Sequence, residues 1–256
     1  MRRAVLLAPT FNPDRPVIER YEDLVRTVAF RYGERSQGIV FVLYDELIAL
    51  RTVLAERPDA VPARAWARSV ADRLAKRYRE DFVDPPNPQL PCTVVSTDPL
   101  VVEFDRDAFE RKYRGAVAEV APDTYEITGP DNPDLVPGRP YMFVIDEAGR
   151  FLVWRRPFNF DELVFGRNRA TVAGIPVAHP MLVPERLRAT AAGEIVFIGS
   201  PTVAAVIVNT KSGHFRLPPS TAPVIYDACR SVLGLPDRAV DVFLVGGNDG
   251  AAADRR

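Results

Sequence analysis

The stretch from Glu194 to Val208 reads EIVFIGSPTVAAVIV, with two apolar runs on either side of Gly199-Ser200-Pro201. Short runs of β-branched and aromatic residues around a turn of glycine and proline are typical of a β-hairpin. A second pair of runs, Tyr141–Ile145 and Phe151–Trp154, flanks a loop that contains a glycine. The sequence therefore predicts two antiparallel hairpins in its second half.

Further along the chain, the pattern predicts a helix over about Ser220–Leu233, ended by Gly234, and a last strand over Val240–Val245. The first third has a different pattern. Apolar residues between Val17 and Val28 follow the i, i+3, i+4 spacing of an amphipathic helix. Another helix is expected from Pro62, since apolar residues step by four from Trp66 to Tyr78 along one face.

Between these segments the prediction is less specific. Ile39–Tyr44 is apolar throughout and fits either a buried strand or part of a helix. Thr93–Val95 and Leu100–Phe104 are predicted as short strands, and Asp105 as the cap of a helix that runs to about Val120.

These patterns predict the α+β class, with a helical N-terminal half and a β-rich C-terminal half of antiparallel hairpins and one late helix. Loop-forming residues near position 130 place the boundary there. Residues 1–130 are expected to form a mainly helical region, either a cover for a site or an interaction platform. Residues 131–256 are expected to form the β-rich domain that carries the site.

Composition narrows the function classes. The 256 residues are 47% hydrophobic and 26% charged, which is typical of a folded globular protein. A formal net charge of -1 excludes the general basic excess of non-specific nucleic-acid binding. No run of 18 apolar residues predicts a membrane span, and the apolar stretch after Met1 is too short for a signal peptide, so we expect a cytoplasmic protein.

Positive charge gathers in the second half. Residues 137–256 hold 14 basic and 11 acidic residues, against 19 and 23 in residues 1–136. Arginines flank the segment around residue 179, and guanidinium groups match phosphate and carboxylate oxygens. From these we expect Arg167, Arg169 and Arg186 to bind an anionic small molecule or a nucleotide. The alternative is an arginine-rich, solvated face.

The chain has only two histidines, His179 and His214. If the hairpin over Glu194–Val208 forms, Glu194 at its start and the segment Lys211–His214 after its end lie at the same end of the hairpin. One strand pairing would then bring a carboxylate, an ammonium, a hydroxyl and an imidazole together.

This set has the groups that general acid–base chemistry needs. One imidazole can accept a proton while the other donates one, so His179 and His214 are the predicted pair. Glu194 would orient a histidine or act as base, and Ser212 would be a nucleophile if an imidazole reached its hydroxyl. Lys211 and Arg216 would stabilise negative charge. In the competing interpretation, the histidines and Ser212 are structural turn residues.

An ordered set of segments in residues 137–245 resembles a domain of plant IQ-motif calmodulin-binding proteins and of the C-termini of bacterial polymorphic toxins. The set comprises the hairpin Tyr141–Trp154, His179–Leu182, Ala191–Glu194, and the Ser-Gly-His-aromatic-Arg segment Ser212–Arg216. The resemblance implies a shared site built from His179, Glu194, Ser212 and His214. Phe215 stands where tyrosine is usual, and Leu217 precedes the prolines. No IQ motif is visible, so calmodulin is not an expected partner.

Other motifs are missing. The sequence has no glycine-rich dinucleotide loop, P-loop or nucleophile elbow, and no closely spaced histidine pair for a metal. We therefore expect neither metal nor cofactor. The leading hypothesis is an enzyme, a hydrolase or transferase, that acts on an anionic substrate such as a nucleotide or phosphodiester. An RNase-like toxin activity and a glycosyl or ADP-ribosyl transfer are two versions of it. The alternative is a non-catalytic module that binds a small ligand or a partner.

Overall fold

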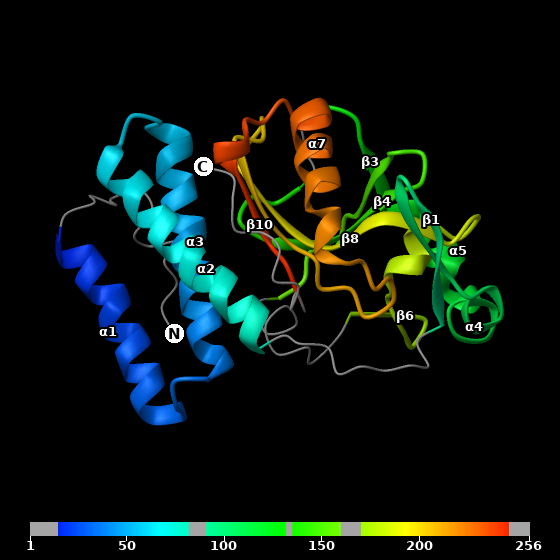
Figure 1. The fold of residues 1–256 in the computed structure, drawn as a ribbon, viewed down its shortest axis with the longest axis horizontal. Helices are drawn as coiled ribbons and strands as arrows, with labels where there is room; N and C mark the ends of the chain where they lie inside the picture. Colours follow the sequence, from blue (N-terminus) through cyan, green and yellow to red (C-terminus); the bar gives the residue numbers. More distant parts are fainter. Residues whose placement is uncertain (1–14, 82–90, 132–134, 160–169, 246–256) are drawn as a thin grey trace.

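A computed structural model describes residues 15–81, 91–131, 135–159 and 170–245. Its N-terminal part is a layer of three helices: α1 (Arg15–Tyr32), α2 (Gln37–Glu56) and α3 (Val61–Asp81). Ser36 caps α2 by accepting a hydrogen bond from the Gly38 amide. Figure 1 shows the three helices side by side at one end of the molecule, with the sheet at the other.

Helix α2 includes the ambiguous segment Ile39–Tyr44, which is helical and not a strand. The segment is apolar all round because α2 packs on α1, on α3 and on the sheet. Ten residues of α2 are buried: Ile39, Val40, Val42, Leu43, Tyr44, Glu46, Leu47, Ala49, Leu50 and Val53. In α3, the predicted face is confirmed, since Val70, Leu74 and Tyr78 are buried.

The rest of the chain forms one eight-stranded sheet around β8 (Arg188–Ile198). On one edge of β8 lies β4 (Pro140–Asp146), followed outward by β5 (Phe151–Trp154) and β3 (Thr124–Ile127). On the other edge, the beginning of β8 pairs with β2 (Leu100–Phe104), and β2 pairs in turn with β1 (Cys92–Thr97). The end of β8 pairs instead with β9 (Ala205–Asn209), which pairs in parallel with β10 (Val240–Phe243).

This arrangement leaves a fork in the sheet. β2 pairs with Arg188 and Ala189, whereas β9 pairs with Glu194 to Ile198. Among the described strands, none pairs with residues 190–193 on this edge of β8. The backbone groups of this stretch that point to the unpaired edge are therefore available to side chains from other segments.

Short elements complete the described chain. They are α4 (Arg106–Lys112), η3 (Arg114–Ala116), α5 (Val117–Val120), η4 (Ala121–Asp123), β6 (Thr171–Val172), β7 (Ile175–Pro176), η5 (His179–Leu182), η6 (Pro219–Thr221), α7 (Ala222–Leu233) and η7 (Asp237–Ala239). Asp105 caps α4 as predicted, through a 2.7 Å hydrogen bond from the Ala108 amide. α7 ends at Gly234, which has a positive φ of 68°.

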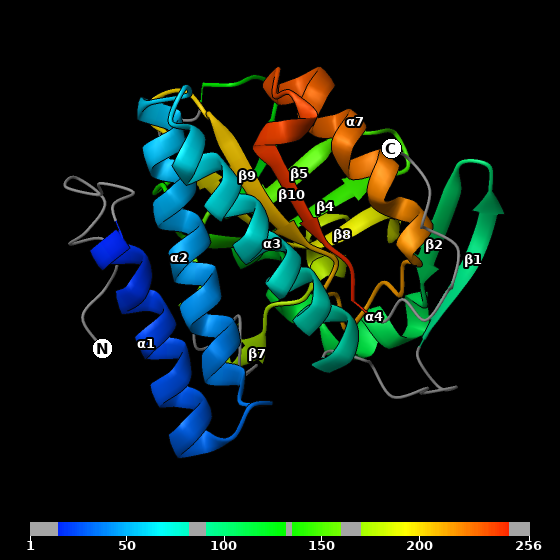
Figure 2. The same ribbon diagram turned by 60° about the vertical axis from the view of Figure 1, so that its left-hand side comes forward.

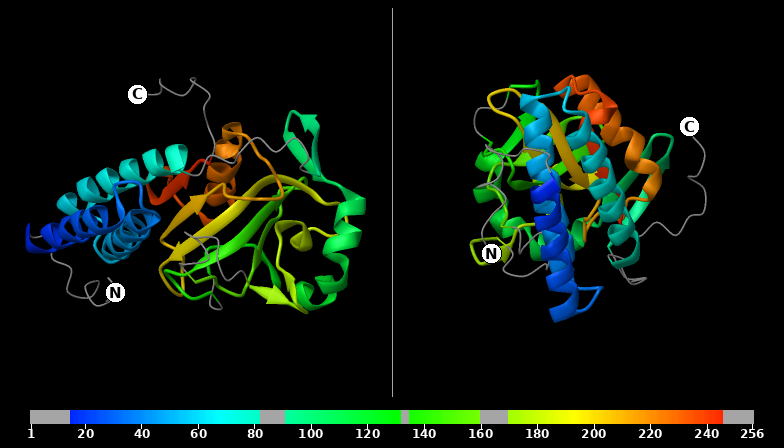
Figure 3. Two further views of the ribbon diagram at one scale, coloured as in Figure 1. Left: turned by 90° about the horizontal axis from the view of Figure 1, so that it is seen from below. Right: turned by 90° about the vertical axis from the view of Figure 1, so that its left-hand side faces the viewer.

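The two faces of the sheet are covered differently (Figures 2 and 3). α7 packs on one face, where its Ile225 and Cys229 meet Phe143, Ile195 and other strand residues. On the opposite face, α2 and α3 cover β9 and the end of β8, while η5 and the helices after β2 cover β4 and the beginning of β8. Two core clusters thus lie next to each other on that face.

The structure confirms the α+β class, with helices in the N-terminal half, a mostly antiparallel sheet and a late helix. Both predicted hairpins form, with Phe143 paired to Val153 and Glu194 paired to Asn209. β1, β2 and β3, which precede residue 130, belong to the same sheet as the later strands.

Candidate functional site

The candidate site lies in the fork of the sheet, where the chain after β9 crosses over β8 at Gly193. A Cβ atom at Gly193 would lie 1.9 Å from the Asn209 carbonyl oxygen and 3.0 Å from the Thr210 Cα. Only glycine fits such an approach of two backbones. The crossing places the segment that follows, residues 211–216, beside the first turn of η5.

His179 begins η5 and points at this crossing. Its Nε2 lies 3.0 Å from the Gly193 carbonyl oxygen. A carbonyl only accepts hydrogen bonds, so Nε2 carries the proton and Nδ1 holds the lone pair of the neutral ring. The residue is only 5% exposed. Its environment therefore fixes both the orientation and the tautomer of the ring.

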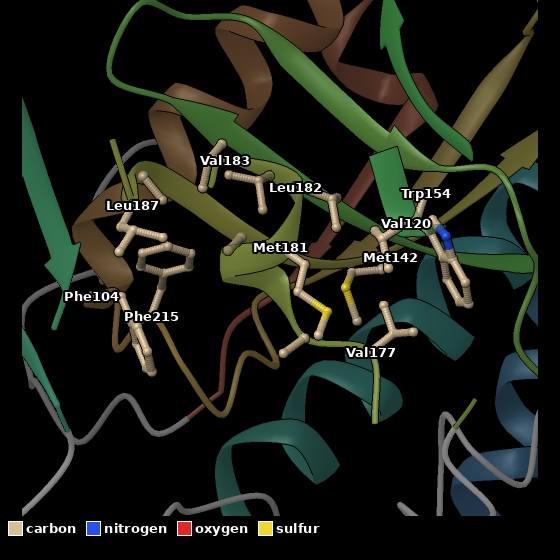
Figure 4. Packing of buried hydrophobic residues seen from close by; sticks show 14 of the residues in the cluster. Phe104, Val120, Met142, Trp154, Val177, Met181, Leu182, Val183, Leu187 and Phe215 are labelled. Atoms are coloured by element: carbon tan, nitrogen blue, oxygen red, sulfur yellow. The ribbon is translucent and has the colours of Figure 1, made fainter. Parts of the chain in front are cut away.

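His214 lies in the connection between β9 and α7 and is half-buried. Its Nε2 is 2.8 Å from the hydroxyl of Tyr113, the residue that directly follows α4. The rings of Tyr113 and Phe104 lie against it, with centroids at 5.4 and 5.9 Å. Phe215, the next residue, packs near Phe104 and Leu187 in the adjacent core cluster, which anchors this connection (Figure 4).

The two imidazoles lie next to each other, but the structure lacks the substrate-sized gap between them that the acid–base hypothesis requires, and His179 is buried. Their ring centroids are 6.1 Å apart and the planes are inclined by 47°. At this separation the rings are neighbours, and no space for a substrate is left between them. His179 is buried, and Nδ1 is buried in both rings, so Nε2 of His214, beside the Tyr113 hydroxyl, is the remaining ring nitrogen that a ligand could approach.

Ser212 is buried and closes a local turn. Its hydroxyl oxygen accepts hydrogen bonds from the amides of Phe215, at 3.0 Å, and His214, at 3.4 Å. This is the usual local use of a serine side chain and it holds His214 in place. The proposed role of Ser212 as a nucleophile stays a prediction.

Glu194 belongs to a polar network that links the sheet to the helices. Its carboxylate accepts a 2.9 Å hydrogen bond from Asn209 Nδ2, which also lies 3.3 Å from the Tyr78 hydroxyl. Asn209 is fully buried and accepts a hydrogen bond from the Lys211 amide. The Tyr44 hydroxyl of α2 lies beside this network. Its pKa is raised, mainly by burial and to a smaller extent by the negative charge of Glu194. The network fixes the point where the chain leaves β9.

The predicted arginines divide into separate groups. Arg167 and Arg169 lie outside the described residues. Arg186 forms an ion pair with Glu147, which also binds Arg188 at 3.0 Å. These guanidinium groups lower the pKa of the Glu147 carboxyl. Lys211 and Arg216 are half-buried and belong to the same connection as His214.

Sequence reasoning missed Tyr113 and Asn209. Tyr113 is 101 residues from His214, and nothing in the local pattern around it signals a polar contact. Asn209 was detectable, since an asparagine that directly follows the apolar run Val206–Val208 is a polar residue at a strand end. Its buried position is set by the pairing with Glu194.

Comparison with known proteins gives no assignment, since no family model, no curated protein and no solved structure matches the chain. Within the described ranges, no helix is both long enough and apolar enough to span a membrane. The same residues contain no group of three or more histidine, cysteine or acidic side chains arranged to hold a metal ion.

Proposed function

We propose that the protein is an enzyme that performs acid–base chemistry on a small anionic substrate, with His179 and His214 as the proton-transfer pair. The observation that carries the proposal is the contact of the only two imidazoles, which come from segments 35 residues apart in the sequence. A hydrolase or a transferase that acts on a nucleotide or a phosphodiester fits this pair best.

Contact between the rings supports complementary protonation states. Two positive charges at this distance in a partly buried site repel each other, so the doubly protonated pair is disfavoured. When one ring holds an extra proton, the other then tends to stay neutral. One ring thus holds a proton while the other can accept one, so that His179 can complement the protonation state of the ring that meets the substrate.

The two rings have different roles in this proposal. His214 meets the substrate because it is the more exposed ring, and it acts through Nε2, beside the orienting Tyr113 hydroxyl, because its Nδ1 is buried. His179 is held by the Gly193 carbonyl, and because its Nδ1 is buried it acts on the neighbouring His214 ring and not directly on the substrate. Glu194 acts through Asn209 on the backbone that carries His214. Lys211 and Arg216 supply positive charge for the substrate anion.

The resemblance to the domain of plant IQ-motif proteins and bacterial toxins supports the same residues. Its quoted segments supply His179, Gly193-Glu194 and Ser212–His214, and these surround the crossing at Gly193. We propose that this crossing is the common element of the site.

Phosphorus NMR can test the proposal with a panel of ATP, NAD, cyclic AMP and a short RNA. We expect the wild type to convert one of these substrates, and His214→Gln to lower the rate by about 100-fold or more. Tyr113→Phe should lower the rate by a smaller factor, because it removes an orienting hydroxyl. Tyr125→Phe is the matched control, since Tyr125 lies on β3 and contacts Arg155.

Two outcomes would contradict the proposal. If the wild type binds a panel member but converts none, the non-catalytic ligand-binding module is the better description. If conversion is found and His214→Gln leaves its rate unchanged, the activity belongs to other residues.

A further inference from the structure

A second candidate site lies between the helical layer and the sheet, away from the histidines. It is a cavity of about 420 Å³, bounded by the end of α2, the first half of α3, the start of β9 and η7. The volume is within the range of small-molecule sites. We call it the arginine cavity, because Arg51, Arg64, Arg68 and Arg238 line it.

The charges in this cavity are not balanced. Arg51 binds both oxygens of Asp241, at 2.6 and 2.7 Å, which joins α2 to β10. Asp237, also in the lining, is bound by Arg230, which is outside it. That leaves Asp72 as the remaining acidic group in the lining, opposite three arginines.

Those three arginines have no acidic partner in the described parts of the chain. Arg64 donates to the Pro58 carbonyl, while Arg68 and Arg238 are exposed at the rim. Two of them lie one helical turn apart on α3, at positions 64 and 68, and the third projects from η7. Guanidinium donors thus face the cavity from two elements.

A second cavity in the same molecule provides a direct comparison. It has a volume of about 570 Å³ and is lined by Arg150, Arg186 and Arg188. Each of these arginines forms an ion pair, with Asp146 or with Glu147. In this second cavity every lining arginine has an acidic partner. The lack of such partners in the arginine cavity is therefore not explained by the high arginine content of the protein.

We propose that the arginine cavity binds the phosphate group of a small phosphorylated molecule, through Arg64, Arg68 and Arg238. Forked guanidinium donors match phosphate oxygens, and a group of three suits a doubly charged anion. On β9 the cavity is lined by Ala205, the first residue of the strand. The histidine site lies at the other end of the strand, at Asn209, about 13 Å away at the usual rise per residue. This inference is therefore independent of the proposed function.

A ligand in this position would bridge α3 and η7. Because it would bind the assembled layers and not the unfolded chain, it should raise the melting temperature of the protein. Inorganic pyrophosphate is a suitable probe, with sodium chloride at matched ionic strength as the blank.

Isothermal titration of the full chain with pyrophosphate tests the proposal. We expect saturable binding by the wild type, a loss of affinity of about tenfold for Arg68→Gln, and a larger loss when Arg238→Gln is added. Arg150→Gln, in the second cavity, is the matched control and should bind within about twofold of wild type. The substituted residues are exposed, and the circular dichroism melting curve of each variant checks its fold.

Either of two results would overturn the proposal. One is that the wild type shows no saturable binding at millimolar pyrophosphate, or that Arg68→Gln with Arg238→Gln binds as the wild type does. The other is that His214→Gln abolishes binding while the arginine variants keep it. That second result would place the anion at the histidine pair, so it would remove this inference and leave the proposed function standing.

Discussion

The histidine site and the helical layer both bury titratable groups, but they do so in different ways. In the fork of the sheet, polar groups from β8, η5, α4 and the connection after β9 meet. In the helical layer, Glu46 of α2 is 1% exposed and receives one hydrogen bond, from the Trp66 indole of α3. None of the described residues donates to its second oxygen.

The neighbours of Glu46 explain the difference. Val42 and Ala49 lie on the same face of α2 and pack against Tyr21 of α1. Burial raises the pKa of the Glu46 carboxyl to about 7, although the Trp66 hydrogen bond lowers it. Burial of a titratable group is thus not enough to indicate a site. The fork differs because several such groups converge there, with their orientations fixed by backbone contacts.

The largest effect is expected at the crossing in the fork. Gly193→Ala would place a methyl group 1.9 Å from the Asn209 carbonyl oxygen, and backbone atoms cannot move away without breaking the β8–β9 pairing. We expect a loss of about 4 kcal/mol or more in the free energy of unfolding, measured by urea denaturation.

Gly115→Ala is the matched control for this substitution. Its Cβ would meet only Ile175 Cδ1, at an ordinary 3.7 Å, so its effect should be within about 1 kcal/mol. Equal losses in the two variants would contradict the close crossing, and with it the explanation of how residues 211–216 reach His179.

The helical layer should show a smaller effect that depends on pH. The pKa of Glu46 in the folded state is about 7, above its ordinary value of 4.5, so the folded protein keeps a proton that the unfolded chain loses. Stability from this group is full below pH 4.5 and falls as the pH rises to about 7, by about 3 kcal/mol.

Glu46→Gln mimics the protonated carboxyl and should remove this fall. We expect the variant to be more stable than the wild type at pH 8, by up to about 3 kcal/mol, and about equally stable at pH 4.5. Urea denaturation at both values measures the difference. If the variant were less stable than the wild type at pH 8, the buried Glu46 carboxylate would not destabilise the folded protein, and this interpretation would be wrong.

The smallest of these effects concerns the link between the two regions. Tyr78→Phe removes the hydroxyl that lies 3.3 Å from Asn209 Nδ2 and should cost about 1 kcal/mol of unfolding free energy. Tyr32→Phe is the control, because Tyr32 is 72% exposed and should show no measurable change. Identical stabilities would show that the helical layer does not support the fork through this contact.

Much of the fold follows from local patterns. Asp105 caps a helix, Gly234 ends one, and the runs around Gly199-Ser200-Pro201 pair, because capping and strand alternation depend on neighbouring residues. Local patterns could not decide Ile39–Tyr44, since a helix buried on several sides has no polar face. They also could not predict the parallel pairing of β9 with β10, which joins distant segments.

The site shows the same limit. Pairing of Glu194 with Asn209 was enough to place Glu194 and residues 211–214 at one end of a hairpin. The contact between His179 and Gly193 depends on the fork, which forms because β2 and β9 occupy separate parts of one β8 edge. Strand order of this kind is set by the packing of the whole sheet, so the sequence alone could not show it.

The central claim is that His179 and His214 act as one coupled pair. Because the chain has only two histidines, proton NMR can observe the ring protons of each imidazole, with single variants for assignment. We expect a nuclear Overhauser effect between the two rings, whose centroids are 6.1 Å apart, and a change in the His214 ring resonances in His179→Gln. If the rings show no such effect and the His214 resonances are the same in the wild type and in His179→Gln, the pair does not exist.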